Sequence, residues 1–413
     1  MTEPSRHSIN TAGRRFSGVR GLAARMRRRR EVAKLQSRTA ATVIVLTLVA
    51  LAVCVWPFAK CHLQAVAVLD LVANRPVPSL LRATVAEPIA TQELTINTSQ
   101  GAVKARLYIP VGKPNAPALV VLHGVHHLGM NEPRLIAFAS AMASCGLRVL
   151  TPELPDIKDY HVGKNSIATI GDAATWLAQQ NGGKPVGVMG LSFSGGLSLL
   201  AAADPQYKPA IKFVVAVGSQ DEMSRVAEYY RTGEDMRPNG KEELLPPHEY
   251  GALVLEYESL EDFVPESDLT ALRAVLRAHL YEDAAGEKAA LAALTPQQLA
   301  EAKQLMNTTS PATQAMLAKS EAKHVADMAG VSPHGHLKGL TTPVYLLHGE
   351  GDNIIPSAET MWMADELPNE TLQTELISPV ISHLDMDGAG PSALDQWRLV
   401  HFFALVLRAA EKR

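Results

Sequence analysis

The stretch VGVMGLSFSGG, residues 186–196, decides the fold because an apolar strand segment is followed directly by several glycines and serines. Its first part is a short apolar run of the kind that forms a buried strand of a parallel sheet. The run ends near Gly190, and Ser192 and Ser194 follow where the chain must turn. A sharp strand-to-helix turn holds a serine hydroxyl out of the sheet only when its neighbours are small. Both serines are therefore candidates for a nucleophile.

The flanking residues favour Ser192 as the nucleophile and leave Ser194 as a small residue of the turn. Ser192 has Gly190 two positions before it and Ser194 two positions after it, with Gly195 next. It also follows the predicted strand directly. Because Ser194 stands where the G-x-S-x-G motif has its last glycine, the motif alone does not distinguish a nucleophile from an ordinary strand-to-helix loop. The interpretation therefore depends on partner residues further along the chain.

Short apolar segments alternate with helical patterns along most of the chain. A strand pair is predicted for LTINTSQGAVKARLYI, and single buried strands for ALVVLHG, LRVLTPEL, PVGVMG, IKFVVAVG and PVYLLHGE. Between the strands, apolar residues recur at helical spacing, as they do from Ile170 to Leu177. This alternation predicts an α/β fold with a mostly parallel, doubly wound sheet and helices on both faces.

One interval, residues 219–338, interrupts the alternation. It contains no convincing buried strand, but leucines recur at helical spacing between residues 269 and 280. A second helix is predicted to begin at TPQQ, residues 295–298, which combines a cap, a first-turn proline and a capping-box glutamine. We expect this interval to form a helical subdomain inserted into the sheet domain.

Two later segments place an acid and a histidine directly after predicted strands. The first, YLLHGEGDNIIP at residues 345–356, has Asp352 in the loop that follows its strand. The second, LISPVISHLDMDG at residues 376–388, has His383 in the corresponding place. Serine, then acid, then histidine is the chain order of a catalytic triad on a mostly parallel sheet. This order strengthens the assignment of Ser192.

The chemistry of a serine nucleophile gives each partner a role. An imidazole takes the serine proton, and a carboxylate fixes the tautomer of the imidazole and stabilises the imidazolium. We expect His383 to be the base and Asp352 to orient it. Asp221 is a second candidate for the acid, because it also follows a strand that ends at the same edge of the sheet. Asp352 is preferred for its HG-x-x-D setting.

Backbone amides are expected to stabilise the oxyanion of a tetrahedral intermediate. The amide of Phe193, directly after the nucleophile, is one candidate donor. The loop HGVHHLGMNEPRL, which follows an early strand, supplies the other, for which we favour the amide of Val125. His126 and His127 in the same loop are expected to shape the mouth of the site.

The sequence predicts neither a metal site nor a cofactor. The four histidines that stand out lack an acid or third ligand at helix spacing; they are His126, His127, His334 and His336. The chain has only 3 cysteines, too few and too scattered for a disulfide framework or a thiolate cluster.

The N-terminal part is strongly basic and then apolar. The first 38 residues hold 11 Lys and Arg against 2 Asp and Glu, so the rest of the chain holds 28 against 40. A nucleic-acid substrate is therefore not expected for this acidic body. No charged residue occurs in residues 39–59, and a run of roughly 20 apolar residues is long enough to span a bilayer.

We expect this apolar run to be an uncleaved single-pass anchor. The basic residues before it predict a cytoplasmic N-terminus, and Trp56 suits the far interface, so the body is expected on the outer, periplasmic or extracellular side. A cleaved signal peptide is the alternative. The run is longer than the usual h-region, and the small-x-small site at Ala65-Val66-Ala67 lies well beyond it.

The motifs HGVHH, GLSFSGG, HGEGD and SHLDMDG, in that order, resemble the α/β-hydrolase superfamily, and among its members those similar to dienelactone hydrolases and esterases. The resemblance extends roughly from residue 90 to residue 410, with residues 219–338 in the position of a helical cap. It implies an α/β-hydrolase fold with a cap that shapes the acyl or alcohol pocket. A serine nucleophile separates the chain from the aspartate-based branches of the superfamily.

The function expected from these residues and this resemblance is hydrolysis of a carboxylic ester or related acyl bond through Ser192, His383 and Asp352. An acyltransferase using the same triad and an inactive hydrolase fold that binds a partner are the alternatives. We expect the chain to divide into six segments, two of which form the hydrolase core: a basic cytoplasmic arm (1–38), a transmembrane anchor (39–59), a connector (60–88), the hydrolase core (89–218 and 339–413) and a helical cap (219–338).

Overall fold

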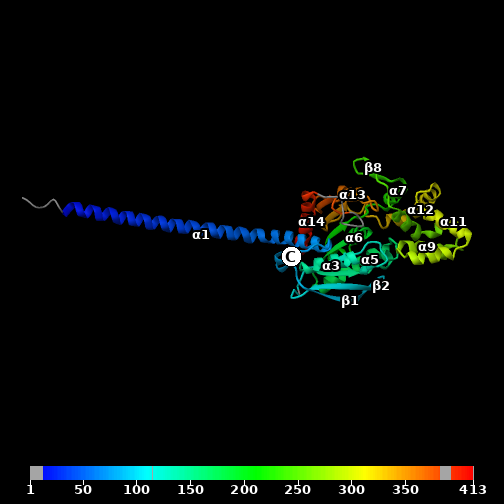
Figure 1. Ribbon diagram of the computed structural model, residues 1–413, viewed down its shortest axis with the longest axis horizontal. Coiled ribbons are helices and arrows are strands. Elements are labelled where there is room, and N and C mark those ends of the chain that lie inside the picture. Colours follow the sequence, from blue (N-terminus) through cyan, green and yellow to red (C-terminus); the bar gives the residue numbers. More distant parts are fainter. Residues whose placement is uncertain (1–12, 114, 382–391, 413) are drawn as a thin grey trace, which may run out of the picture. The chain divides into compact units, whose positions relative to one another are not determined.

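The structure of the chain is a computed structural model that describes residues 13–113, 115–381 and 392–412 (Figure 1). The chain divides into two compact units, Met1–Ala59 and Lys60–Arg413. Helix α1 (Gly13–Val72) begins in the first unit and ends in the second. The predicted catalytic residues all belong to the second unit.

The described part of the first unit is an exposed helix. From residue 39 to residue 57 every side chain is exposed, although the segment consists mainly of Ala, Val, Leu, Ile and Thr. Among the described residues, one helix, within Arg25–Val72, is long and apolar enough to cross a membrane. A signal sequence near an N-terminus has the same features, so the helix is a candidate for either an anchor or a signal.

The second unit is built on an eight-stranded sheet with the order β1-β2-β4-β3-β5-β6-β9-β10. Strand β2 runs antiparallel to both of its neighbours, and the other pairs are parallel. The sheet confirms the predicted fold class. The strands are β1 (Ile89–Thr98), β2 (Gly101–Pro110), β3 (Ala118–Leu122), β4 (Arg148–Pro152), β5 (Val186–Leu191), β6 (Ile211–Val217), β9 (Val344–Gly349) and β10 (Leu372–Ser378).

Helices cover both faces of this sheet because its strands are apolar on both sides (Figure 1). In β3, Val120 packs in one core cluster and Leu119 and Val121 pack in the other, as the alternation of side chains along a strand requires. Helices α5 (Lys164–Gln180) and α6 (Phe193–Ala203) contribute to the first cluster. Helices α3 (Pro133–Ser144) and α14 (Ala393–Glu411) contribute to the second.

The segment expected to be a connector is largely helical. Helix α1 continues to Val72, and a short helix α2 spans Ser79–Val85. Within the last turns of α1, Cys61 and Ala65 are buried in the same core cluster as α14. The end of α1 is thus a packed part of the second unit. The sequence did not predict this packing, because the prolines that follow the helix suggested a connector. The predicted boundaries of the six segments otherwise stay predictions.

Between β6 and β9 the chain forms mainly helices, which gather at one end of the second unit (Figure 1). Leu272, Leu276 and Leu280 are buried on one helix, and Thr295 and Gln298 form the expected capping box of another. A small hairpin was missed, because its two strands have only three residues each and are polar. The elements are α7 (Met223–Thr232), β7 (Glu234–Met236), β8 (Glu242–Leu244), α8 (Glu249–Glu258), α9 (Leu269–Leu280), α10 (Ala284–Ala292), α11 (Pro296–Leu305) and α12 (Pro311–Ala329).

The remaining elements are short. They are helix α4 (Pro155–Lys158), helix α13 (Ala358–Glu366) and the 3₁₀ turns η1 (Gly129–Asn131), η2 (Lys208–Ala210) and η3 (Leu260–Asp262).

Helix α8 buries an acid among apolar neighbours. Glu256 has no exposed surface, and neither of its carboxylate oxygens has a hydrogen-bond partner. Burial raises the pKa of Glu256 from 4.5 to about 9. The folded protein therefore holds this side chain protonated at neutral pH, because an unpaired buried charge is far more costly than a buried acid.

Glu256 is expected to make the protein less stable as the pH rises. Between pH 4.5 and 9 the unfolded chain releases a proton that the folded protein keeps, so the free energy of unfolding falls with pH, by up to about 1.4 kcal/mol per pH unit from this group. Glu256→Gln removes this slope. Thermal unfolding of both proteins across this pH range checks it, with Glu249→Gln, an exposed change on the same helix, as the control. Parallel pH profiles for wild type and Glu256→Gln would contradict the assignment.

Candidate active site

Ser192 occupies a strained turn between β5 and α6. Its backbone has φ 56° and ψ −139°, a conformation that is unusual for a residue with a side chain. The turn is held by hydrogen bonds from the amide of Ser192 to the carbonyl of Val217 (2.8 Å) and from the amide of Gly195 to the carbonyl of Ser192 (2.9 Å). Strain of this kind persists only where the surroundings enforce it, and such places are often active sites.

The glycines around Ser192 are required because backbone and side-chain atoms of neighbouring segments approach them closely. A Cβ atom on Gly190 would lie 2.3 Å from the carbonyl oxygen of Ser194. A Cβ atom on Gly195 would lie 1.9 Å from the hydroxyl of Ser219. The glycines that flank the turn therefore allow β5, α6 and the end of β6 to pack against one another, as the sequence pattern predicted.

The two serines of the motif lie in different environments. Ser194 is fully buried, and its hydroxyl donates a hydrogen bond to the carbonyl of His123 (2.5 Å). Ser192 is partly exposed at the N-cap of α6. The assignment of Ser192 as the nucleophile and of Ser194 as a residue of the turn stays a prediction, which the partial exposure of Ser192 favours.

The loop that follows β3 lies directly beside Ser192. A Cβ atom on Gly124 would be 3.0 Å from the Cβ of Ser192 and 3.7 Å from its hydroxyl. The ring of His123 holds this loop, because Nδ1 donates to the carbonyl of Gly124 (2.8 Å) and Nε2 accepts from the amide of Leu154 (3.0 Å). Burial lowers the pKa of His123 to about 4, so its ring is neutral and acts as a support.

The predicted oxyanion donors, which stay predictions, are Phe193, directly after the serine, and Val125, directly after Gly124 in the adjacent loop. Phe193 is the first residue of α6, and the first amides of a helix have no partner within the helix. Val125 is buried in the loop beside Ser192, and its carbonyl accepts a hydrogen bond from the hydroxyl of Tyr250 on α8 (2.8 Å). Burial raises the pKa of Tyr250 well above 10, which keeps that hydroxyl a donor.

Asp352 lies buried in the turn after β9. Its Oδ1 accepts hydrogen bonds from the amides of Ile354 and Ile355, both at 3.0 Å. Its Oδ2 lies 3.4 Å from Nε2 of His348. The ring of His348 is itself held between the carbonyl of Ile355 and the hydroxyl of Thr360. The carboxylate is thus fixed in a single orientation at the carboxyl end of the strand.

His383 lies outside the described residues, which end at residue 381 and resume at residue 392. Strand β10 pairs in parallel with β9 and ends at Ser378, so the chain leaves the sheet at the same edge as Ser192 and Asp352. The assignment of His383 as the base stays a prediction.

The second candidate acid, Asp221, is engaged elsewhere. Its Oδ2 pairs with the guanidinium of Arg225 at 2.9 Å and lies 3.1 Å from Nδ1 of His334. Burial and the neighbouring Glu359 carboxylate raise the pKa of Asp221 to about 6, although Arg225 and His334 oppose this rise. Asp221 therefore belongs to a buried ion cluster, and this arrangement favours Asp352 as the acid.

Tyr250 and Tyr281 connect the loop after β3 to the inserted helices, Tyr250 by its hydrogen bond to the carbonyl of Val125 and Tyr281 by stacking on His127. His126 and His127 stack with ring centroids 4.6 Å apart, and His127 stacks on Tyr281 at 4.7 Å. Burial lowers the pKa of both histidines, and the neighbouring His127 lowers the pKa of His126 further. Tyr250 and Tyr281 were not predicted as site residues, because contacts between residues more than a hundred positions apart leave no local pattern in the sequence.

A cavity of about 400 Å³ lies between α8, α12 and residues 161–164. Its lining includes Met223, Leu255, Glu258 and His324 but not Ser192. We therefore do not assign it to the candidate catalytic residues.

The chain was compared with known proteins and with a family model. Among solved structures, an esterase from Pyrobaculum calidifontis is 16% identical, with 84% of this chain and 88% of that chain covered and a TM-score of 0.42. A 2-hydroxy-6-oxo-6-phenylhexa-2,4-dienoate hydrolase from Rhodococcus sp. is 15% identical, with 72% and 92% covered and a TM-score of 0.39. None of the curated proteins compared matches the chain. The family model described as alpha/beta hydrolase fold matches residues 117–380, so the chain belongs to the alpha/beta hydrolase family.

Proposed function

We propose that the protein is a serine hydrolase that cleaves carboxylic ester or related acyl bonds. Family membership supports hydrolase activity in general, and the fold alone does not name the reaction. The observation that carries the proposal is the backbone of Ser192, with φ 56° and ψ −139° at the N-cap of α6. This turn places the hydroxyl beside the loop of Gly124 and Val125, where a nucleophile and oxyanion donors are needed together.

In the first half of the reaction, His383 removes the proton of the Ser192 hydroxyl while the oxygen attacks the substrate carbonyl carbon. The carbonyl oxygen gains negative charge and accepts hydrogen bonds from the amides of Phe193 and Val125. The intermediate then expels the alcohol, which takes the proton from His383, and an acyl-enzyme remains. Asp352 stabilises the imidazolium while it exists, through a carboxylate already held by two amides.

In the second half, water takes the place of the alcohol. His383 removes a proton from the water as it attacks the acyl carbon, and the second tetrahedral intermediate uses the same two amides. Release of the acid returns the proton to Ser192. The inserted helices contribute to the environment of this step, because Tyr250 holds the carbonyl of Val125 and Tyr281 stacks on His127. An alcohol in place of water would make the protein an acyltransferase.

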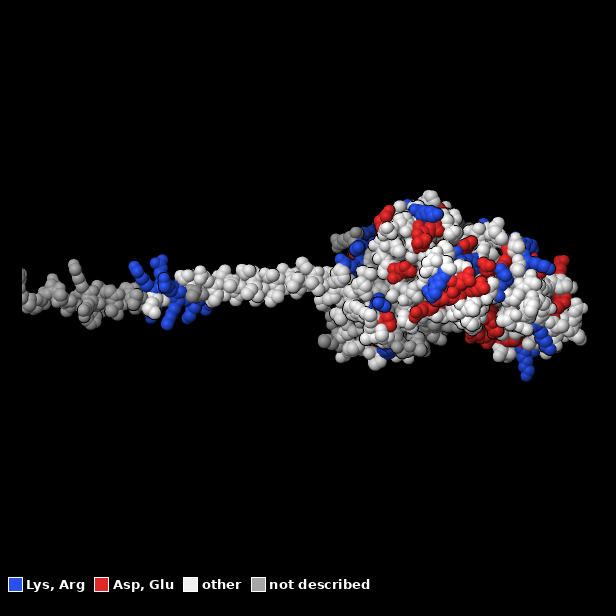
Figure 2. Space-filling view, turned by 90° about the horizontal axis from the view of Figure 1, so that it is seen from above, with Lys and Arg blue, Asp and Glu red and all other residues white. Residues whose placement is uncertain are grey.

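We further propose that the N-terminal helix is an uncleaved single-pass anchor. Figure 2 shows a cluster of basic side chains on the helix, followed by a stretch without charged side chains; in the sequence these are the basic residues between positions 25 and 38 and the uncharged residues 39–59. This order supports a cytoplasmic N-terminus and a catalytic unit on the outer, periplasmic or extracellular side. The substrate would then be a small ester or acyl compound on that side of the membrane.

Ser192→Ala is expected to abolish covalent labelling by a fluorophosphonate and to reduce ester turnover by at least about 1,000-fold. The reason is that the probe and the substrate both react with the same hydroxyl. Two measurements on the full chain in detergent check this expectation: fluorophosphonate labelling of the protein, and turnover of a panel of p-nitrophenyl esters.

Ser194→Ala is the matched control, because its buried hydroxyl bonds to His123 and is not presented to substrate. We expect it to retain labelling. Labelling that survives in Ser192→Ala and is lost in Ser194→Ala would transfer the nucleophile to Ser194. No labelling of the wild-type chain would favour an inactive hydrolase fold that binds a partner.

An alkaline phosphatase fused after Arg413 is expected to be active, because that enzyme folds only outside the cytoplasm. Replacing the four arginines at positions 27–30 by alanine should lower the activity, since these residues favour retention of the N-terminus inside. An active cytoplasmic reporter at the same position would contradict the orientation. Release of the mature protein into the soluble fraction would identify a cleaved signal instead.

A further inference from the structure

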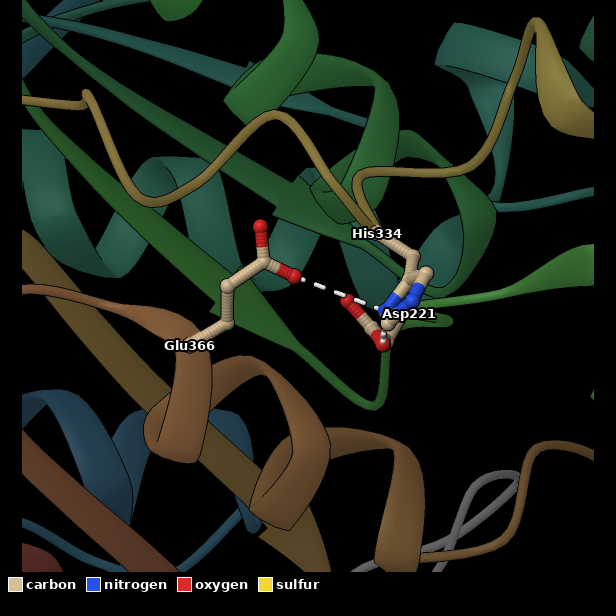
Figure 3. Close-up of side chains that lie close together, drawn as sticks. All are labelled: Asp221, His334 and Glu366. Atoms are coloured by element: carbon tan, nitrogen blue, oxygen red, sulfur yellow. Dashed lines mark hydrogen bonds and ion pairs between the residues drawn. The ribbon is translucent and has the colours of Figure 1, made fainter.

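Asp221, His334 and Glu366 converge from three segments of the chain outside the candidate triad (Figure 3). One ligand atom from each lies within 4.8 Å of the other two. Nδ1 of His334 is 3.1 Å from Oδ2 of Asp221 and 3.4 Å from Oε2 of Glu366. Figure 3 shows both carboxylates directed toward the same edge of the imidazole ring.

Backbone hydrogen bonds hold these side chains in place. The amide of His334 donates to the carbonyl of Asp221 at 3.0 Å, which joins the two segments directly. Glu366 accepts hydrogen bonds from the amide of Gly335 at Oε2 (2.9 Å) and from the amide of Leu337 at Oε1 (3.0 Å). The cluster is therefore organised before any ligand arrives, which reduces the ordering cost of binding.

One oxygen of the cluster has no partner. Asp221 has no exposed surface, its Oδ2 faces Arg225 and His334, and its Oδ1 has no hydrogen-bond partner. A buried carboxylate oxygen that lacks a donor carries a desolvation penalty, and this penalty is larger for a charged group than for a neutral one. A cation bound to the Asp221 carboxylate on the side of Oδ1 would remove that penalty, whereas Oδ2 is the oxygen that lies 3.1 Å from His334.

Negative charge also exceeds positive charge around Asp221. Arg225 is shared among three carboxylates, because it pairs with Glu222 (3.0 Å) and Glu359 (2.5 Å) in addition to Asp221. Glu359 is itself buried and accepts the amides of Asp221 and Glu222. Glu366 adds a fourth carboxylate beside His334. One guanidinium does not neutralise this set, so a further cation would be favoured here.

We propose that Asp221, His334 and Glu366 bind a divalent transition-metal cation, with Zn²⁺ as the type that fits their chemistry. Zn²⁺ accepts both imidazole nitrogen and carboxylate oxygen as ligands, whereas Ca²⁺ and Mg²⁺ prefer oxygen ligands alone. Tetrahedral ligands at zinc distances lie about 3.4 Å from one another. The separations of 3.1 and 3.4 Å around Nδ1 of His334 agree with this value.

The position of the cluster indicates a structural metal. Asp221 follows β6 at the start of the inserted helices, and His334 follows α12 at their end. Glu366 is the last residue of α13, which belongs to the sheet domain. A metal bound to all three would fasten both ends of the insertion to the sheet. The imidazole of His334 is half-exposed, which leaves a route for the ion and room for a water ligand.

The proposal is tested by measuring zinc binding to the full chain in detergent. The protein is purified with a tag that lacks histidine, and bound metal is first removed with a chelator. Isothermal titration with ZnCl₂ should show one site per chain in wild type. His334→Ala should weaken that site by more than the roughly 10- to 100-fold loss typical of an outer-shell change. His336→Ala is the matched control, because His336 is exposed two positions away and belongs to no such cluster among the described residues. Zinc should raise the melting temperature of wild type and His336→Ala, and not that of His334→Ala.

Glu366→Gln gives an independent check, since it keeps the size of the side chain and removes the charge that faces His334. It should weaken zinc binding while His336→Ala does not. Equal zinc affinity of wild type and His334→Ala, or no saturable binding by wild type, would overturn the proposal. Binding of Ca²⁺ or Mg²⁺ in preference to zinc would overturn the choice of metal. Fluorophosphonate labelling of Ser192 is a separate readout, so this result and that of the proposed hydrolase are distinguishable.

Discussion

The sharp turn at Ser192 is the constraint on which the rest of the second unit depends. A residue with a side chain at φ 56° costs on the order of 1–3 kcal/mol, so neighbouring interactions must enforce it. The glycines at positions 190 and 195 let β5, α6 and β6 approach, and the Ser194 hydroxyl ties the turn to the carbonyl of His123. These features bring the serine, a helix N-terminus and the loop after β3 to one edge of the sheet.

The candidate site is supported from both the sheet domain and the insertion. The neutral ring of His123 holds the carbonyl of Gly124, and Tyr250 of α8 holds the carbonyl of Val125. Movement of α8 would therefore reach the loop of Gly124 and Val125 directly. The proposed zinc ligands lie where the insertion leaves and rejoins the sheet, at Asp221 and His334, so a metal there would limit such movement.

Much of the fold followed from local patterns. Apolar strand segments alternating with helices predicted the parallel sheet, and the requirement for small residues predicted the turn at Ser192. The packed end of α1 and the hairpin β7–β8 were missed, because apolar burial and strand pairing there depend on distant residues. Tyr250 and the cluster of Asp221, His334 and Glu366 were missed for the same reason. A single sequence shows the order of residues along a strand but not which side chains meet across the fold.

A crystal structure of the full chain after reaction with a fluorophosphonate tests the central claim most directly. We expect a phosphorus bonded to the Ser192 hydroxyl oxygen, with the phosphoryl oxygen within hydrogen-bond distance of the amides of Phe193 and Val125. We also expect the imidazole of His383 to lie between the Ser192 oxygen and the carboxylate of Asp352. A covalent adduct on any other residue, or His383 paired with Asp221 or remote from Ser192, would contradict it.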